Sequence, residues 1–530
     1  MRTALSLDFR RGIREINQMR LFAATVIFGV VFSLLGCLNP LFPRTTSELP
    51  QIEAAEPSDA LFSAGMLVNS TTVSQEWHYS AINVQEAWGV LHDSLYAPRF
   101  NNVVVAVIDT GVSDHSDLNA NLDLDNAWDF FNNVSSVSDD GILRPYNPTP
   151  IRTWHGTHVA GTVGAVTDND GTGVSGIGWN RLTVLPLKVF EGNDATIEAI
   201  VNSVLYAAGE NVPGPGRLSE PVKVINLSLG GASAEPILRE AIEIAVARGI
   251  TVIAAAGNCA DAAGGPCSTK NQPLYPAAFP NVIAVGATTK DRERADYSNY
   301  GSHLEFVAPG GGGTSVEDLI WSTNGPGEYY YFGMAGTSMA APHVAGVVGL
   351  MYAYNPNLTQ YAVRDILRRT AVHPGGLTWD PEYGFGLIDA GKALLNTPAA
   401  IGALHRTGET PLAAAGTVGG PEYEPPEPGA YLPDDATEVT PGRVMVRLQL
   451  PDTATGSERD EAVALLAAAY GAHDANRFHP LFVTMEFDPA RDVRDIVSRI
   501  VAEPTVRYSQ GETRYTLLPI ASTPWIPQSP

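Results

Sequence analysis

The chain has few basic residues for its length. Its 530 residues include 33 Lys and Arg against 57 Asp and Glu, a formal net charge of −24 at pH 7. Nucleic acids and anionic membrane surfaces repel so acidic a chain, which argues against partners of either kind. The balance is compatible with a soluble exported protein, and carboxylates on loops can also bind calcium.

Cysteine is scarce as well, with three residues in the whole chain. Cys259 and Cys267 lie in a short Gly-rich loop, and Cys37 follows an apolar run near the N-terminus. Spacing alone does not separate a disulfide from a metal-binding pair. In an exported chain, a disulfide that closes the loop is the better interpretation.

The N-terminus has the pattern of an export signal. Several arginines precede residues 21–35, which are apolar and uncharged. No A-x-A cleavage site follows closely. The sequence LLGC, which ends at Cys37, resembles the lipobox of bacterial lipoproteins, although Leu35 replaces the smaller residue that is usual there. The resemblance implies a lipoprotein-type signal peptide over residues 1–36 and a lipid on Cys37 that attaches the protein to a membrane of the cell envelope.

Two other interpretations of this segment stay open. The apolar run is near the short limit for an uncleaved helix that spans a bilayer. It is also compatible with an ordinary signal peptide that releases a secreted protein. All three interpretations export the chain.

The length exceeds what one hydrophobic core usually holds, so more than one domain is expected. Residues 37–70 are polar and rich in Pro, Ser and Thr, which predicts a tether. Residues 71–398 alternate short β-branched apolar runs with helical segments. This alternation predicts an α/β domain with a mainly parallel sheet covered on both faces. Functional residues of such folds gather at the carboxyl ends of the strands.

A second domain is expected near the C-terminus. Residues 399–441 are rich in Pro, Gly and acidic residues and are predicted to be a linker. Residues 442–520 show strand and helix patterns in the order β-α-β-α-β, which predicts a small ferredoxin-like α+β domain. Residues 521–530 would form a tail.

Three sites in the large domain combine a reactive side chain with a strand end or a helix start. Asp109 ends an apolar strand, where a carboxylate is costly to bury unless it is paired. His155 opens a predicted helix, with His158 one turn later, but the glutamate of an H-E-x-x-H zinc motif is missing. Ser338 lies in GTSMAAPHVAG, at the start of another predicted helix. Each residue alone could be an ordinary cap.

Taken together, these residues fit acyl-transfer chemistry. Such chemistry needs a nucleophile, a base that takes its proton and an acid that orients the base, and Ser338, His155 and Asp109 match these roles. Asn258, which ends another predicted strand, could donate a hydrogen bond to an oxyanion. The alternative from another class is a catalytically silent surface protein that keeps the fold and binds peptides.

The motifs VIDTGV, HGTHVAGT, LSLGG, AAAGN and GTSMAAPHVAG resemble those of the subtilisin-like serine proteases, the subtilase family, in that family's order of Asp, His and Ser. The resemblance covers about residues 75–398. It implies a three-layer subtilisin-like fold, serine endopeptidase activity on peptide or protein substrates, and no cofactor for the chemistry. It also implies that Ser338 attacks, His155 transfers the proton, Asp109 orients His155, and Asn258 with the Ser338 backbone N–H binds the oxyanion.

The resemblance further implies a cleft in which an extended substrate pairs with an edge strand. The residues implied to form the edge strand and the walls of the S1 pocket are Ser228, Leu229, Gly230, Ala255, Ala256 and Gly257. Leu274 falls near the base of S1 and would favour an apolar residue before the scissile bond. Trp154 stands where the family usually has Gly and would shape the S2 side of the cleft or pack on a neighbouring loop.

A structural calcium ion is the one metal that the resemblance implies. Asp117 matches a family ligand, and Asp168 is the best candidate in the loop 167–173. This loop has two extra residues, and the usual N-terminal ligand region, NSTTVSQEW, lacks an acid. A solvated acidic loop without metal is the alternative.

The C-terminal domain resembles the propeptide domain that precedes many subtilisin-like proteases, where it acts as a folding chaperone and inhibitor. Here it follows the protease. The resemblance implies that residues 442–520 bind the protein's own active-site cleft as an intramolecular inhibitor or chaperone. The alternative is an accessory module that merely shares a common fold.

Overall fold

The computed structural model describes residues 52–63, 65–68, 71–144, 151–169, 173–261, 267–312, 315–327, 331–398, 429–431, 439–451 and 453–516. The predicted signal peptide, Cys37 and the tail 521–530 lie outside these residues, as does most of the predicted linker. Within the described part of the chain, no helix is both long and apolar enough to cross a membrane.

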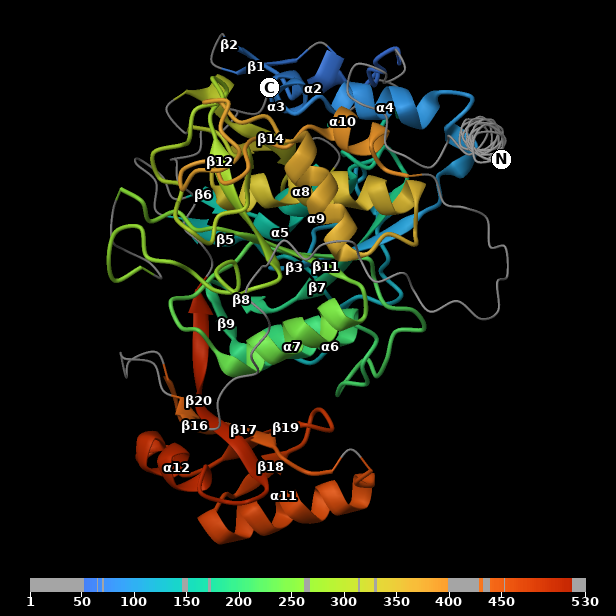
Figure 1. Cartoon of the computed structure of the whole chain (residues 1–530). Coiled ribbons are helices and arrows are strands. Elements are labelled where there is room, and N and C mark those ends of the chain that lie inside the picture. The colour runs from blue at the N-terminus through green and yellow to red at the C-terminus, as the bar shows by residue number, and fades with distance from the viewer. Residues whose placement is uncertain are drawn as a thin grey trace, which may run out of the picture. The chain divides into compact units, whose positions relative to one another are not determined.

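A seven-stranded sheet forms the centre of the large domain (Figure 1). Its order is β13-β12-β11-β10-β3-β7-β4, and all neighbouring strands are parallel. The bounds are β3 Val103–Asp109, β4 Trp128–Asp129, β7 Leu182–Lys188, β10 Val224–Leu227, β11 Thr251–Ala255, β12 Val282–Thr288 and β13 Phe306–Pro309. Every residue of β10 to β13 is buried, because both faces of the sheet are covered. The predicted α/β fold with a mainly parallel sheet is confirmed.

Helices cover both faces of this sheet, with α5 and α8 on one side and α6 and α7 on the other (Figure 1). Their bounds are α5 His155–Gly164, α6 Ile197–Ala207, α7 Pro236–Ala247 and α8 Thr337–Tyr354. Every residue of α8 is buried. Its small residues permit this, because a Cβ on Gly346 or Gly349 would lie 2.8 Å from Ile177 or Leu182.

Shorter elements complete the large domain. The helices are α2 Ala60–Ser63, α3 Glu76–Ala81, α4 Val84–His92, α9 Gln360–Thr370 and α10 Ala390–Leu395. The hairpins are β1 Met66–Val68 with β2 Thr71–Val73, β5 Ile142–Arg144 with β6 Ile151–Thr153, β8 Phe190–Glu191 with β9 Asp194–Thr196, and β14 Ile320–Thr323 with β15 Tyr331–Met334.

The N-terminal part of the large domain begins earlier than the sequence predicts. Leu61 and Phe62 are buried, and the Phe62 ring packs against Tyr79 and Trp88. A tether would leave these side chains in water. The prediction of a tether is therefore wrong for the end of the range 37–70, because two apolar side chains in a polar segment are enough to anchor it.

The C-terminal domain has its own small sheet and core. Its elements are β16 Gly429–Tyr431, β17 Val439–Leu448, α11 Gly456–Tyr470, β18 Asp474–Asn476, β19 Phe482–Glu486, α12 Val493–Ile500 and β20 Val506–Thr516. The prediction missed β18, in which Ala475 stands between two polar residues and no apolar alternation is present. It also placed β16 in the linker, although this strand pairs with β20.

The last strand of the small domain also belongs to the large one. At its start β20 pairs with β17, and at its end it pairs antiparallel with β9, with Tyr515 opposite Ala195. The resulting strand order is β18-β19-β17-β20-β9-β8. The two domains therefore share one continuous strand.

Candidate active site

Asp109 and His155 form a buried pair. Asp109 is the last residue of β3 and His155 the first of α5, and their side chains are 1% and 0% exposed. Asp109 Oδ1 lies 2.7 Å from His155 Nδ1 and also accepts from the Thr110 backbone N–H at 2.8 Å. The carboxylate holds the proton on Nδ1, so Nε2 of the neutral ring is left as the acceptor. This geometry suits His155 to take a proton from a neighbouring hydroxyl.

Ser338 is the second residue of α8, not its N-cap, which is Gly336. Its Oγ donates to the Ser228 carbonyl oxygen at 3.1 Å, and the Ser228 hydroxyl donates to the Ser338 carbonyl at 2.9 Å. His155 Nε2 is buried and has no hydrogen-bond partner among the described residues. The hydrogen bond between Ser338 and His155 is therefore not formed here, and such bonds are often long in ligand-free active sites.

Asn258 is fixed next to Ser338 by Thr337. The Thr337 backbone N–H and hydroxyl both donate to Asn258 Oδ1, at 2.9 and 2.7 Å. This contact orients the amide, so that Nδ2 faces Gly336, where a Cβ would lie 3.2 Å away. The Thr337 hydroxyl also accepts from the Gly257 N–H. Sequence analysis missed Thr337, although its place directly before the candidate nucleophile is a usable signal.

The predicted walls of the substrate cleft follow β10 and β11. Ser228, Leu229 and Gly230 leave β10, and Ala255, Ala256 and Gly257 end β11 and continue past it. Leu274 is fully buried and packs against Gly257, where a Cβ would lie 2.7 Å from its side chain. Asn299, which the sequence analysis missed, donates to the Ala256 carbonyl and accepts from the Cys259 N–H.

Two further sequence features lie near the site. Trp154 directly precedes His155. Its ring packs closely against Gly141 and Gly325 of two neighbouring loops, where an added Cβ would lie 2.7 and 3.1 Å from the ring. Cys259 and Cys267 are joined by a disulfide directly after Asn258.

His158, which could have suggested a metal, instead belongs to a buried group of neutral histidines. Its Nε2 donates to the Ile320 and Phe332 carbonyls at 2.9 and 3.0 Å. On the same side of the sheet, His78 Nδ1 lies 2.9 Å from His343 Nε2. Burial lowers the pKa of His158 to about 3 and of His343 to about 4, and it lowers the pKa of His78 well below its usual value.

The residues predicted to bind calcium lie in one region with an acid that the sequence analysis missed. Asp117 is buried and accepts from Val174 N and Asn169 Nδ2, at 2.9 and 2.7 Å. Asp59, fully buried in the predicted tether, accepts from Asp168 N and from the Ser175 hydroxyl. The Asp168 side chain is exposed and accepts from Ser58 instead.

The electrostatics of this region suit a cation. Burial, with some repulsion from Asp59, raises the pKa of Asp117 to about 7. Burial, with some repulsion from Asp168, also raises the pKa of Asp59. Carboxylate, amide and carbonyl oxygens are the ligands that calcium prefers. Among the described residues, however, no group of three or more His, Cys, Asp or Glu side chains is arranged to hold a metal ion. Asp59 and Asp117 are the two buried carboxylates of this region, and the exposed Asp168 carboxylate lies near Asp59.

The small domain meets helices α6 and α7 through paired charges. Arg443 of β17 lies 2.7 Å from Glu198 of α6, and Arg447 lies 2.9 Å from Glu240 of α7. The Tyr508 hydroxyl also donates to Glu240 at 2.9 Å. These carboxylates are mostly buried by the small domain, so each pair is shielded from water.

Beyond this contact, β20 brings Tyr515 to the predicted edge strand. Tyr515 is 1% exposed, and its ring occupies the space over Gly231, where a Cβ would lie 2.8 Å away. Its hydroxyl donates to the Ser233 carbonyl at 3.2 Å. Gly231 is three residues from Ser228, the hydrogen-bond partner of Ser338. Sequence analysis did not identify Tyr515, because nothing in the sequence indicates which strand of the large domain it pairs with.

Comparisons with known proteins agree with this arrangement. A profile of the subtilase family matches residues 101–386. The chain is 36% identical over 366 residues to an extracellular protease of Xanthomonas campestris pv. campestris, in a match that covers 65% of this chain and 59% of the relative. It is 36% identical over 294 residues to subtilisin DY of Bacillus licheniformis, covering 55% of this chain and 90% of the relative.

A solved structure and a further relative give the same result. A protease from Pseudoalteromonas arctica aligns with a TM-score of 0.53 and 32% identity, over 64% of this chain and 99% of its own. The extracellular basic protease of Dichelobacter nodosus is 32% identical over 66% of this chain. The chain spans 59% of the length of this relative and of the Xanthomonas protease.

Proposed function

The chain belongs to the subtilase family, and we propose on this basis that it is a serine endopeptidase that hydrolyses peptide bonds through an acyl-enzyme. The observation that carries the proposal is the buried 2.7 Å contact between Asp109 and His155 in the structural frame of that family. It supplies an oriented base, which is what a serine hydroxyl needs to become a nucleophile. The chemistry needs no cofactor.

The family resemblance and the geometry of the site support the following roles. Ser338 attacks the scissile carbonyl carbon, while His155 Nε2 takes the hydroxyl proton and later gives it to the leaving amine. Asp109 keeps the ring in the correct tautomer and stabilises the imidazolium. Asn258, oriented by Thr337, and the Ser338 backbone N–H donate to the oxyanion. For the attack, the Ser338 side chain must leave the Ser228 carbonyl and turn to His155.

A fluorophosphonate probe tests the assignment, because it reacts only with an activated serine. We expect the wild type to be labelled, labelling to be lost in Ser338→Ala and to fall about 100-fold or more in His155→Ala. Ser302→Ala, which changes an exposed serine of the same domain, is the control. A wild type that is not labelled, even with the small domain displaced, would favour the silent, peptide-binding alternative.

Export to the cell envelope is the proposed location, with a lipid on Cys37. The relatives from Xanthomonas and Dichelobacter are named as extracellular proteases, which supports export. Mass spectrometry of the mature protein decides between the three signals. A diacylglyceryl group on an N-terminal Cys37 supports the lipid anchor, an unmodified N-terminus further on supports secretion, and an intact residue 1 supports an anchor helix.

The small domain is proposed to restrain the peptidase as an intramolecular inhibitor. Three contacts support this: the pairing of β20 with β9, the burial of Tyr515 over Gly231, and the charge pairs on α6 and α7. A substrate would pair with the same edge of the large domain, so the small domain and a substrate would compete for it.

Tyr515→Ala tests the restraint in the full chain. It removes a side chain from the predicted cleft without changing the core of the small domain, so we expect faster fluorophosphonate labelling. Tyr470→Ala is the matched control, because the Tyr470 hydroxyl bonds to Arg499 and Glu503 inside the small domain. Equal labelling rates for wild type and Tyr515→Ala would support an accessory module instead.

A structural calcium ion is proposed for the region of Asp59 and Asp117. The ion would be held by oxygen ligands, far from any catalytic step, and would offset the repulsion between two buried carboxylates. The measurement is the thermal midpoint with and without a chelator, in Ser338→Ala to prevent self-digestion. We expect calcium to raise the midpoint in this protein and not in its Asp117→Asn variant, and a midpoint independent of calcium would support the solvated loop.

A further inference from the structure

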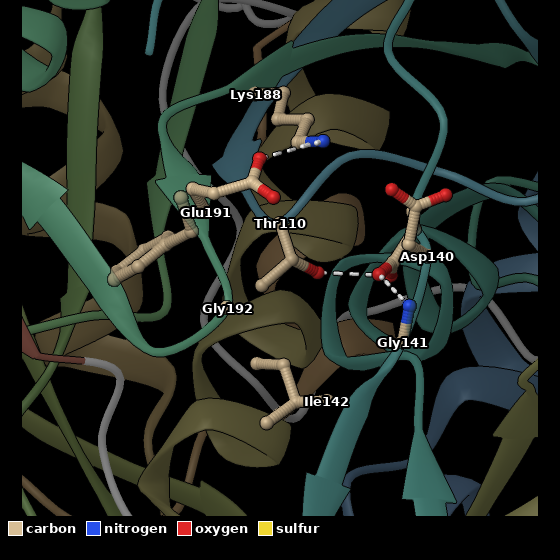
Figure 2. Close-up of a pocket in the computed structure, with 9 residues that line it drawn as sticks. Thr110, Asp140, Gly141, Ile142, Lys188, Glu191 and Gly192 are labelled. Atoms are coloured by element: carbon tan, nitrogen blue, oxygen red, sulfur yellow. Dashed lines mark hydrogen bonds and ion pairs between the residues drawn. The ribbon is translucent and has the colours of Figure 1, made fainter. Parts of the chain in front are cut away.

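A second acid is buried beside the candidate active site. Asp139 is 4% exposed, and its carboxylate accepts hydrogen bonds from the Thr110 hydroxyl at 2.9 Å, the Gly141 N–H at 3.1 Å and the Thr157 hydroxyl at 3.2 Å. Figure 2 draws the bonds from Thr110 and Gly141 as dashed lines, and both residues line the pocket shown there. All three groups donate to the carboxylate, as does the Thr157 backbone N–H at 3.5 Å, so the surroundings suit the ionised acid.

The partners of Asp139 belong to the two segments that carry the Asp109–His155 pair. Thr110 follows Asp109, donates its N–H to the Asp109 carboxylate, and accepts the Gly156 N–H at 2.8 Å. Thr157 is two residues past His155 on α5. The Asp139 carboxylate therefore bridges the end of β3 and the first turn of α5. Asp109 and His155, which stand at these two places, are 46 residues apart in sequence.

The neighbouring acid provides an internal comparison. Asp140 is exposed, and its side chain contacts only Ser138 among the bonds of the described residues. The two adjacent aspartates thus share a loop and a charge, but only Asp139 turns inward. The surrounding loop favours this, because Asp139 N donates to the Val112 carbonyl and Gly141 has a φ of +70° that a larger residue would adopt with difficulty.

We propose that Asp139 is a positioning residue of the peptidase reaction. By hydrogen-bonding to Thr110 and Thr157, its carboxylate fixes the position of Asp109 relative to His155. This inference rests on the proposed function. A bridge between two segments acts through placement, and small displacements of reacting groups cost much of the rate. Asp139 itself does not touch the substrate or the scissile bond.

Because Asp139 carries a charge that depends on pH, its proposed role should be visible in the pH dependence of the reaction. The charged and titratable groups around it are Asp109 on β3, His155 on α5, Lys188 on β7, Glu191 on β8, Arg152 on β6 and the adjacent Asp140. Burial, with a contribution from the negative charge of Asp109, raises the pKa of Asp139 to about 7. At lower pH the carboxyl becomes neutral, loses its match to the three donors and no longer stabilises a positive imidazolium.

The experiment compares Asp139→Asn with Asp140→Asn on a peptide substrate across pH. We expect Asp139→Asn to lower kcat about 10- to 100-fold with KM within about twofold, while Asp140→Asn stays at the wild-type value. Since a negative charge near His155 disappears, the acid limb of kcat/KM should move about half a pH unit lower in Asp139→Asn. A residue with only a structural role would leave the position of the limb unchanged.

Thr110→Val and Thr110→Ser keep the inference testable if Asp139→Asn does not fold. Thr110→Val retains the shape and removes the bridging hydroxyl, so it should lower kcat, whereas Thr110→Ser should restore most of it. Wild-type kinetics and an unmoved acid limb in Asp139→Asn, with normal fluorophosphonate labelling, would overturn this inference alone. A wild type that is not labelled would overturn the proposed function with it.

Discussion

The large domain and the contact that the small domain makes with it are built differently. In the large domain, strands β10 to β13 and helix α8 are buried along their whole lengths, and small apolar residues do most of the packing. The contact with the small domain surrounds a few apolar side chains, such as Tyr508, with paired charges on Arg443 and Arg447. Ion pairs fix orientation and are weakened when salt screens their charges, whereas apolar packing is not subject to this screening. The difference predicts that the contact with the small domain can be released while the core of the large domain stays folded.

Removing an aromatic side chain from the core should have the largest effect. Phe306 of β13 is fully buried and packs against Phe385, so Phe306→Ala should destabilise the large domain by about 3–5 kcal/mol. Thermal unfolding in the Ser338→Ala background measures this. Tyr361→Ala, which changes an aromatic residue that is 62% exposed, should stay within about 0.5 kcal/mol of the parent. Equal losses would show that burial does not govern stability here.

Reversing a charge in the contact should release the small domain while both cores stay folded. Glu240→Arg places a second positive group opposite Arg447 and should weaken the contact by about 3 kcal/mol. This corresponds to roughly 100-fold faster fluorophosphonate labelling. Adding Arg447→Glu should restore slow labelling, because the pair is re-formed in reverse. Arg499→Ala, whose partner Asp495 lies on the same helix, is the control. A double variant no slower than Glu240→Arg would contradict the role of the pair.

The two domains also differ in covalent crosslinks, because the large domain contains the disulfide and residues 439–516 contain no cysteine. The disulfide closes a short loop next to Asn258, with a sequence separation of 8. Replacing both Cys259 and Cys267 by Ser should destabilise the large domain by about 2 kcal/mol, at the low end of the usual range because the loop is short. The midpoint of the small domain should not change. A shift of both midpoints would mean that the two domains unfold as one unit.

Acidification should weaken the large domain by a smaller step. His78, His158 and His343 are buried and neutral, with pKa values lowered by burial, so at falling pH the unfolded chain binds protons that the folded domain does not. The contribution of each histidine to the free energy of unfolding is fully present above the pKa of a histidine in the unfolded chain, near 6.5. It declines at lower pH, by about 0.7 kcal/mol per histidine between pH 7 and pH 6. His343→Gln should reduce this slope in thermal midpoints from pH 7 to pH 5. An unchanged slope would mean that other groups dominate.

The sequence was sufficient to predict the fold and the site where a reactive residue and a clear hydrophobic pattern occur in the same short segment. The apolar strand that ends at Asp109 and the small-residue helix that begins at His155 predict both the sheet and the contact between the two side chains. The same holds for the pairing of Cys259 with Cys267, where an exported chain and a short loop favour a disulfide.

Contacts between distant segments could not be predicted in this way. Asp59 looked like part of a polar tether, and only folding brings it to residues 168 and 175. Asp139 and Asp140 are equivalent in sequence, and the turn at Gly141 decides which one is buried. Strand β18 has no apolar alternation and exists because its backbone pairs with β19. In each case the deciding interaction joins parts of the chain that no local pattern connects.

The shared strand β20 has a consequence for the order of events during synthesis. Ser338 is translated about 180 residues before the end of β20, and at about 5 to 20 residues per second this corresponds to roughly 10 to 35 seconds. Throughout that interval the chain on the ribosome contains all the proposed catalytic residues but not yet the strand proposed to restrain them. Under this proposal the large domain would have to fold after the last strand has emerged, and export in an unfolded state would provide such a delay.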